Sequence, residues 1–171
     1  MDTELQQQLP VLISLAADWA RQQERLIAQH GFPLPEQGLE LARGVGVRQP
    51  VRVRIQVVPE IPMPDHPALL ALSKSSGLGG GSVGLTLGYG IYVKDGHLTT
   101  QLVSHELRHV HQCEILGGID WFMAVYLPQV AILGYREAPL ERDLGRPLAS
   151  PCSEQPAGAA CSRRCRASVD S

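Results

Sequence analysis

The segment His105-Glu106-Leu107-Arg108-His109 constrains the fold of this chain more than any other feature of its sequence. Two histidines four residues apart differ by about 40° around a helix, so on a helix both imidazoles can reach one metal ion. Glu106 then lies close to the metal but is free to act as a base. The segment therefore predicts a helix that carries a metal site. Zinc fits this site because imidazole and carboxylate are its usual ligands.

The region before this helix predicts two more helices and a strand. Apolar residues recur at three- and four-residue steps from about Thr3 to His30, which is typical of an amphipathic helix. Pro35 suits the first turn of a second helix that runs to about Arg43. Residues 51–57 alternate apolar and polar side chains in period two, which indicates a strand with one buried face.

Loops and further strands are expected between that strand and the metal-site helix. Residues 59–67 contain four prolines and residues 73–82 are rich in Ser and Gly, so both predict loops. Residues 84–93 predict one or two strands. Thr99 or Thr100 can then cap the metal-site helix.

A mononuclear catalytic zinc needs a third protein ligand. The acidic candidates after the motif are Glu114, Asp120, Glu137, Glu141 and Asp143. His111 lies about 240° around the helix from His105, so it is expected to face away. Pro139 favours Glu141 over Glu137, because proline suits the first turn of a new helix and disfavours helical geometry in the residue before it.

Four ordered elements between Gly77 and Asp143 also resemble a known family. They are Thr86-Leu87-Gly88, the helix from His105 to Gln112, the apolar segment from Ile115 to Tyr135, and Ala138-Pro139-Leu140-Glu141. The family comprises small bacterial zincin-like, metallopeptidase-like proteins of the gluzincin type. The resemblance implies that Glu141 is the third ligand, that Glu106 is the general base and that the core is α+β. Ala138 stands where the family usually has Asn, and Asp143 where it usually has a small residue.

These elements predict an α+β, zincin-like fold in which the metal-site helix packs on a small mixed or antiparallel sheet, with additional N-terminal helices over residues 1–46. A chain of 171 residues with 44% hydrophobic residues is expected to form a single domain, here over residues 1–144. Residues 145–171 are dominated by Pro, Ser, Ala, Gly and Cys without periodicity and predict a disordered tail.

Residues 115–134 are long and apolar enough on their face to span a bilayer. Spanning would put His109 and Glu141 on opposite sides of the membrane. Pro128 also interrupts the segment and Gly117-Gly118 precede it, so we expect instead a buried helix or a pair of half-helices that fold back. Peripheral contact through this segment, with Trp121, Phe122 and Tyr126 dipping into lipid, is the alternative.

Charge and cysteine content narrow the partners and the compartment. Fifteen basic against seventeen acidic residues, without a basic stripe, indicate no nucleic-acid partner. The amino terminus has no basic start ahead of an apolar stretch, so a cytoplasmic location is expected. The cysteines form no Cys-x-x-Cys pair and suggest neither a disulfide framework nor a zinc knuckle; they are Cys113, Cys152, Cys161 and Cys165.

The expected function is zinc-dependent hydrolysis, with a peptide or protein as the favoured substrate. Zinc held by His105, His109 and Glu141 would polarise a carbonyl and acidify water, and Glu106 would take the proton. An edge strand within residues 85–93 could pair with an extended peptide. Candidates for stabilising the oxyanion are Tyr89, Tyr92 and Tyr135. The alternative is a non-catalytic, zinc-binding interaction protein.

Overall fold

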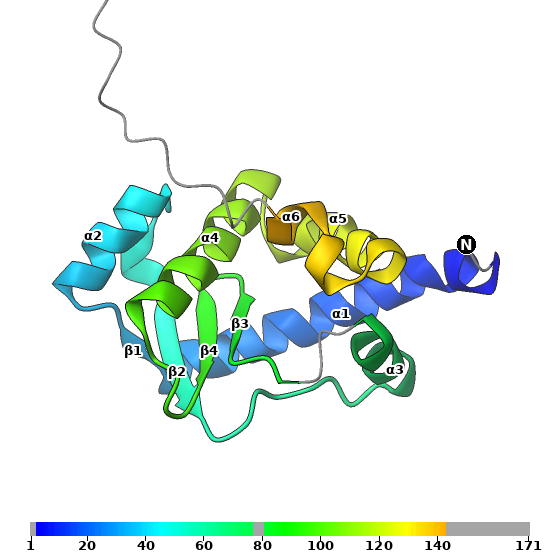
Figure 1. Cartoon of the computed structure of the whole chain (residues 1–171), viewed down its shortest axis with the longest axis horizontal. Coiled ribbons are helices and arrows are strands. Elements are labelled where there is room, and N and C mark those ends of the chain that lie inside the picture. Colours follow the sequence, from blue (N-terminus) through cyan, green and yellow to red (C-terminus); the bar gives the residue numbers. More distant parts are fainter. Residues whose placement is uncertain (1–2, 77–80, 143–171) are drawn as a thin grey trace, which may run out of the picture.

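The computed structural model describes residues 3–76 and 81–142 (Figure 1). In this part of the chain six α-helices accompany a four-stranded mixed sheet, so the expected α+β class is confirmed. The helices are α1 (Thr3–His30), α2 (Glu36–Val45), α3 (Pro67–Ser76), α4 (Thr100–Leu116), α5 (Ile119–Leu133) and α6 (Pro139–Arg142). The strands are β1 (Phe32–Pro33), β2 (Arg54–Val58), β3 (Gly84–Leu87) and β4 (Gly90–Lys94).

The sheet has the order β1-β2-β4-β3, with β2 and β4 parallel and the other pairs antiparallel. Helices α1 and α4 lie on opposite faces of it (Figure 1). A separate hydrophobic core therefore lies on each face of the sheet, and alternate residues of β4 belong to different cores. Ile91 and Val93 pack with α2 and α4 on one face, whereas Tyr92 packs with α1 on the other. The sheet thus fixes α4, the predicted metal-site helix, beside the edge strand β3.

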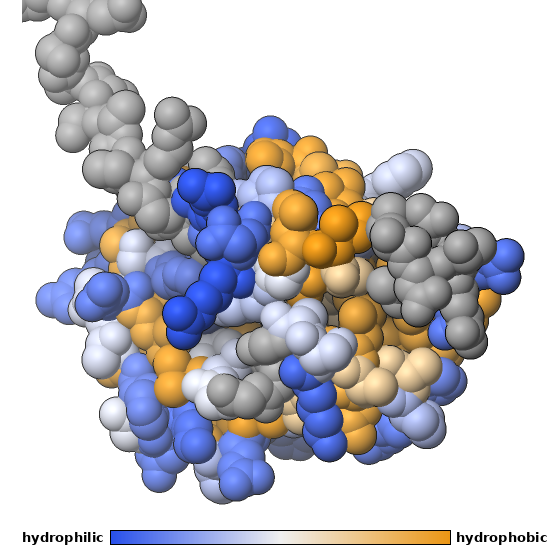
Figure 2. All heavy atoms as spheres, turned by 45° about the vertical axis from the view of Figure 1, so that its right-hand side comes forward, coloured by the Kyte–Doolittle hydropathy of each residue, from blue (hydrophilic) through white to orange (hydrophobic). Residues whose placement is uncertain are grey.

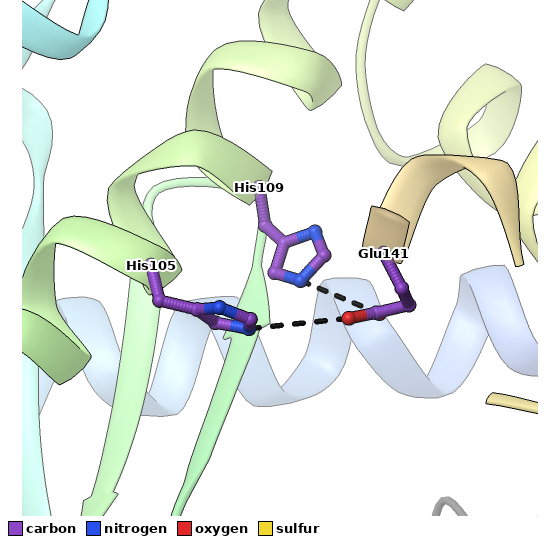
Figure 3. A group of neighbouring side chains, drawn as sticks. All are labelled: His105, His109 and Glu141. Carbon is purple, nitrogen blue, oxygen red and sulfur yellow. Dashed lines mark ion pairs between the residues drawn. The ribbon is translucent and has the colours of Figure 1, made fainter. Parts of the chain in front are cut away.

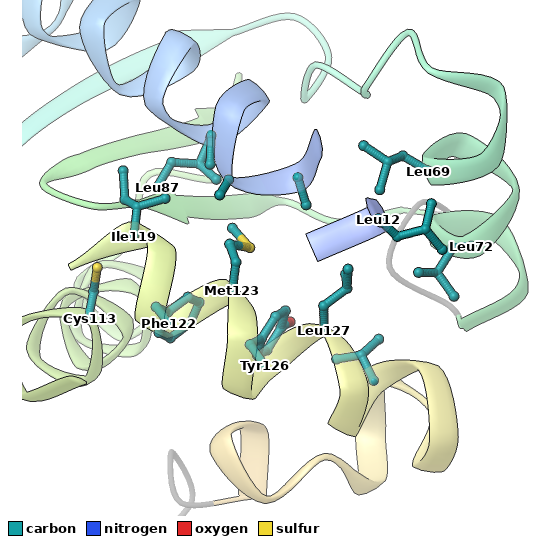
Figure 4. Close-up of a cluster of buried hydrophobic side chains, with 14 of the residues drawn as sticks. Leu12, Leu69, Leu72, Leu87, Cys113, Ile119, Phe122, Met123, Tyr126 and Leu127 are labelled. Carbon is teal, nitrogen blue, oxygen red and sulfur yellow. The ribbon is translucent and has the colours of Figure 1, made fainter. Parts of the chain in front are cut away.

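A second core joins α1, α3 and α5 (Figure 4). Leu12 of α1, Leu69 and Leu72 of α3, and Met123 and Leu127 of α5 are all buried in it. Burial of each such side chain stabilises the fold by roughly 1.5–3 kcal/mol. This core holds α5, and with it the chain leading to α6, against the long first helix.

The start and end of α4 follow from its flanking residues. The Thr99 hydroxyl accepts the Leu102 amide at 3.2 Å, as the sequence predicts for a cap. Gly117 and Gly118 then adopt φ angles of 98° and 111°, which favour glycine, and α5 leaves at 113° to α4. Of the two alternatives expected for residues 115–134, the structure shows the single helix with a buried face, because α5 continues through Pro128 and the chain bends at the glycine pair.

Two expectations for the region before α4 need correction. Residues 50–52 form a 3-10 turn that starts at Pro50, so the strand begins at Arg54 and not at Val51. The Val53 amide donates to the Pro50 carbonyl in this turn, which keeps residues 51 and 52 out of the sheet. The predicted loop over residues 73–82 was wrong at its start, because Ser73 to Ser76 complete α3, a helix that the sequence patterns do not indicate.

The aromatic residues of α5 lie differently from the lipid-contact expectation. Phe122 and Tyr126 are buried, and of the three only Trp121 is exposed, at 66%. Ile132 and Leu133 are also exposed, and Figure 2 shows apolar side chains gathered on one side of the molecule. Within residues 3–76 and 81–142 no single helix qualifies as a membrane span; α4 and α5 qualify only together, as a bent pair.

Candidate metal centre

His105, His109 and Glu141 converge on one point between α4 and α6 (Figure 3). Both histidine Nε2 atoms face the Glu141 carboxylate, at 3.9 Å from His105 and 3.4 Å from His109. One ligand atom from each residue lies within 4.8 Å of the other two. This is the arrangement that the motif and the downstream glutamate predict, and the group can hold a metal ion.

The ring of His109 is oriented by a residue to which the sequence reasoning assigns no role. Its Nδ1 lies 3.0 Å from Oε1 of Gln112, one turn along α4, so a proton on Nδ1 leaves Nε2 free as a ligand atom. The Gln112 amide also donates to the Leu140 carbonyl at 2.9 Å. Gln112 therefore ties a histidine of α4 to the backbone that carries Glu141.

Glu141 is held as an ionised carboxylate. Its side chain is 7% exposed, and Oε1 accepts a hydrogen bond of 2.7 Å from the Tyr126 hydroxyl. Burial alone would raise the pKa of Glu141, but the hydrogen bond and charge of His109, the Tyr126 hydroxyl and His105 hold it below its ordinary value. The Leu140 amide donates to the Gln129 side chain and anchors α6 against α5.

The two histidines differ in their surroundings. His105 is one-third exposed, and burial together with the charge of His109 lowers its pKa. Burial would lower the pKa of His109 too, but Glu141 and Glu106 raise it above its ordinary value. A protonated His109 would form an ion pair with Glu141 across the 3.4 Å separation, and a metal ion would take the place of its Nε2 proton.

Glu106 lies beside the three ligands without joining them. It is 4% exposed, and the Thr86 hydroxyl on β3 donates to its Oε2 at 2.6 Å. Burial raises the pKa of Glu106, opposed by the charge of His109 and by the Thr86 hydrogen bond. A Cβ added to Gly84 would lie 2.3 Å from Oε1 of Glu106, so a glycine is needed where β3 meets this carboxyl group.

Two hollows meet at Glu106. An apolar pocket of about 110 Å³ extends from Glu106 and Glu141 towards α1, α3 and α5. A more polar and open hollow of about 530 Å³ lies on the His105 side of Glu106. Ser82, Gly84, Glu106 and Tyr135 line both. The candidate metal centre is thus bordered by an apolar pocket on one side and an open hollow on the other.

Only one of the three candidate oxyanion tyrosines lines these hollows. Tyr89 donates its hydroxyl proton to Glu114 at 2.9 Å, and Tyr92 donates to Gln23 at 3.0 Å, both away from the metal-site residues. Tyr135 lies beside Glu141, and burial with the charges of Glu141 and Glu106 raises its pKa. Its phenol therefore stays protonated and can donate a hydrogen bond.

The other acidic candidates within the described residues have different partners. Glu137 is 68% exposed and pairs with Arg142. Glu114 accepts the Arg48 and Gln49 amides, and Asp120 pairs with Arg21. Asp143 and the tail cysteines Cys152, Cys161 and Cys165, like the tail expected over 145–171, lie outside the described residues.

Two further motif-region residues are also excluded as ligands. His111 points at Gly46 of the α2 end, away from His105, as its position on the helix predicts. The Cys113 thiol is buried, and burial raises its pKa to about 12.

Two imidazoles and a carboxylate form a group that could hold a metal ion, and such donors suit zinc among others. Ligand atoms at about 2.0–2.1 Å from a tetrahedral metal lie about 3.4 Å from each other. The 3.9 Å separation from His105 and the 3.4 Å separation from His109 run to different oxygens of Glu141, and one ligand atom from each residue lies within 4.8 Å of the other two, so the group would have to close up around such an ion. Comparison with models of protein families, with curated proteins and with solved structures finds no match for this chain, so functional inference starts from the geometry of the centre.

Proposed function

We propose that this chain is a zinc-dependent hydrolase of the zincin type, acting on peptide bonds. The observation that carries the proposal is the position of Glu106, a buried carboxyl group beside His105, His109 and Glu141 but outside the ligand group. Burying an ionisable group costs stability, and the hydrogen bond from Thr86 offsets only part of this cost, which favours a functional role for Glu106. A base next to a three-ligand metal centre is the arrangement that hydrolysis requires.

The residues of the chain divide the chemistry between them. Bound zinc would polarise the substrate carbonyl and lower the pKa of water. Glu106 accepts the proton of the attacking water and passes it to the leaving nitrogen. The Thr86 hydroxyl fixes one oxygen of Glu106, leaving the other free for the proton. Tyr135 donates a hydrogen bond to the negative charge that develops on the carbonyl oxygen.

The free edge of β3 favours a peptide as the substrate. The Lys94 amide of β4 donates to the Val83 carbonyl, and residues of an antiparallel strand bond to the neighbouring strand at every second position. The main-chain groups of Leu85 and Leu87 therefore face β4. The main-chain N–H and C=O groups of Gly84 and Thr86 face outward from the sheet. In the described residues no strand covers this edge. Within residues 85–93, where the sequence predicts an edge strand that could pair with a peptide, only β3 lies at an edge of the sheet, because β4 lies between β2 and β3. An extended peptide could hydrogen-bond along β3 and pass over Glu106.

A purely structural zinc is the alternative, and the centre gives it less support. Structural zinc sites usually have four protein ligands. Within residues 3–76 and 81–142, only His105, His109 and Glu141 bring ligand atoms within 4.8 Å of one another at this point. Glu106 and the two hollows would also have no purpose in such a site.

The proposal is tested by incubating zinc-loaded protein with a mixture of internally quenched peptides. We expect cleavage that a zinc chelator abolishes and added zinc restores. Absence of cleavage by zinc-loaded protein across a mixture that covers every residue type on both sides of the bond would contradict peptidase activity.

Tyr135→Phe should lower kcat by about 100-fold with KM nearly unchanged, because one oxyanion donor is lost while substrate contacts remain. Zinc content after saturation with zinc should stay at the wild-type level, although loss of the Tyr135 hydrogen bond to Glu141 should raise the Kd for zinc by about 10-fold. Tyr89→Phe is the matched control, since its hydroxyl bonds to Glu114 away from the centre. Equal kcat values for the two variants would remove Tyr135 from the mechanism.

Gly84→Ala should lower hydrolysis by about 100-fold, because the added methyl group displaces Glu106 by about an ångström. Zinc binding should persist, since Glu106 is not a ligand. Gly44→Ala on α2 is the control: its Cβ would meet nothing within 4 Å, and the change should stabilise the helix by about 0.5–1 kcal/mol. Full activity in Gly84→Ala would show that Glu106 can move without loss.

A further inference from the structure

The apolar pocket beside Glu106 is built from segments far apart in the sequence. Its wall includes Ala16 and Trp19 of α1, Leu69 of α3, and Met123, Tyr126 and Leu127 of α5. It is therefore a product of the fold around α1 and α3 and not of the metal-site motif. We propose that this pocket selects the substrate by accepting one uncharged, aliphatic side chain of about leucine's size next to the bond that is cleaved. The ligand's identity as a peptide rests on the proposed function.

The chemistry of the wall excludes charged side chains. None of its described lining residues is Lys or Arg, and its ionisable groups other than Tyr126 and Tyr135 are Glu106, His109 and Glu141, which belong to the centre. A buried charge without a partner is strongly unfavourable, and away from Glu106, His109 and Glu141, which the metal centre engages, the wall offers no counter-ion to an Asp, Glu, Lys or Arg side chain. Apolar side chains, in contrast, gain about 25 cal/mol for each Å² removed from water.

The size of the pocket narrows the choice among apolar residues. An apolar cavity of about 150 Å³ in another protein binds benzene. The pocket here has a volume of about 110 Å³, which suits a branched aliphatic chain better than an aromatic ring. Leu69 of α3 and Met123 of α5 both belong to the wall that bounds this volume.

The position of the pocket places the selected side chain beside the reacting bond. The β3 residues from Gly84 to Leu87 line the pocket, and the pocket ends at Glu106 and Glu141. The open hollow continues on the His105 side and shares Gly84 and Tyr135 with it. A peptide that follows β3 across Glu106 would leave one side chain in the apolar pocket and extend its next residues into the open hollow.

Binding can be measured without turnover through Trp19, which lines the pocket. The sequence has two tryptophans, and Trp121→Phe leaves Trp19 as the single reporter. The zinc-loaded Glu106→Gln/Trp121→Phe protein is titrated with acetyl-Ala-X-Ala-amide peptides, where X is Leu, Phe, Ala, Asp or Lys. We expect the Leu peptide to change the Trp19 emission and to bind at least about tenfold more tightly than the Ala, Asp and Lys peptides.

Two leucines of α3 supply a matched pair of variants. Both are buried in the same core, but only Leu69 lines the pocket. Leu69→Ala should enlarge the pocket and shift the ratio of Phe to Leu affinity about tenfold towards Phe. Leu72→Ala should leave this ratio unchanged although it removes the same number of atoms from the core.

The outcomes separate the pocket from the proposed function. Selective binding of the Leu peptide, together with a shift in the affinity ratio that occurs only in Leu69→Ala, supports the pocket assignment even if the unmutated chain cleaves no peptide. Absence of cleavage would then reject only the peptidase function. Cleavage of peptides without preference for an apolar residue beside the bond would overturn the pocket assignment and leave the peptidase function standing. Equal binding of all five peptides, or equal shifts in both leucine variants, would overturn the pocket as well.

Discussion

Glu106→Gln is expected to retain zinc and to lower peptide hydrolysis by about 100- to 10,000-fold, the usual contribution of a general base. The amide has nearly the shape of the carboxylate and can still accept the Thr86 hydrogen bond at its oxygen. It cannot accept the proton of the attacking water. Zinc content and turnover of the variant, measured on the same preparation, therefore separate the base from the ligands.

Glu114→Gln provides the control on the same helix. The Glu114 carboxylate accepts the Arg48 and Gln49 amides and the Tyr89 hydroxyl, on a side of α4 that the two hollows do not reach. This variant should melt at a lower temperature but hydrolyse peptides at the wild-type rate below that temperature. Wild-type turnover by Glu106→Gln would instead show that the activity comes from a contaminating protease.

Glu141→Gln should raise the Kd for zinc by more than about 100-fold. Losing even an outer-shell partner of a ligand costs about 10- to 100-fold in metal affinity, and here a charged ligand itself is removed. The Glu141 carboxylate faces the Tyr126 hydroxyl and the His109 ring. Because the glutamine amide is uncharged, the variant loses the negative charge that would balance the zinc ion. Competition with a fluorescent zinc chelator measures the change.

Glu137→Gln is the matched control for the third ligand. Glu137 is exposed, and its pair with Arg142 at 3.5 Å is of the surface kind that contributes at most about 1 kcal/mol. The Kd for zinc should therefore stay near the wild-type value. If Glu137→Gln weakened zinc binding while Glu141→Gln did not, the third ligand would have to be reassigned.

Local patterns in the sequence predicted the helices that hold the candidate metal ligands. The amphipathic period from Thr3 to His30, the Thr99 cap and the four-residue histidine spacing each act within one or two helical turns, so the sequence alone reveals them. Pro139 similarly marked the start of the short helix that carries Glu141, which the structure places at Pro139–Arg142. These features gave all three candidate ligands and Glu106.

Features that depend on contacts between distant segments were missed. The polar partners Thr86, Gln112 and Tyr126 received no role, because only the fold brings their side chains to Glu106, His109 and Glu141. Gln112 had one local signal, its position three residues after His109 on the same helix face.

Helix α3 and the apolar pocket were missed for the same reason. The α3 sequence mixes Leu with Ser and Ala, and the helix is stabilised by packing on α1 and α5 more than by its own pattern. The pocket requires α1, α3 and α5 together, and no local pattern describes such a surface.

The central claim is that His105, His109 and Glu141 form one zinc site, and the zinc content of the purified chain tests it most directly. Protein prepared without chelator, or incubated with zinc and then desalted, should contain about one zinc ion per chain by mass spectrometry of the metal. The His105→Ala/His109→Ala variant should contain almost none. Wild-type zinc content well below one after incubation, or equal content in the double variant, would contradict the claim.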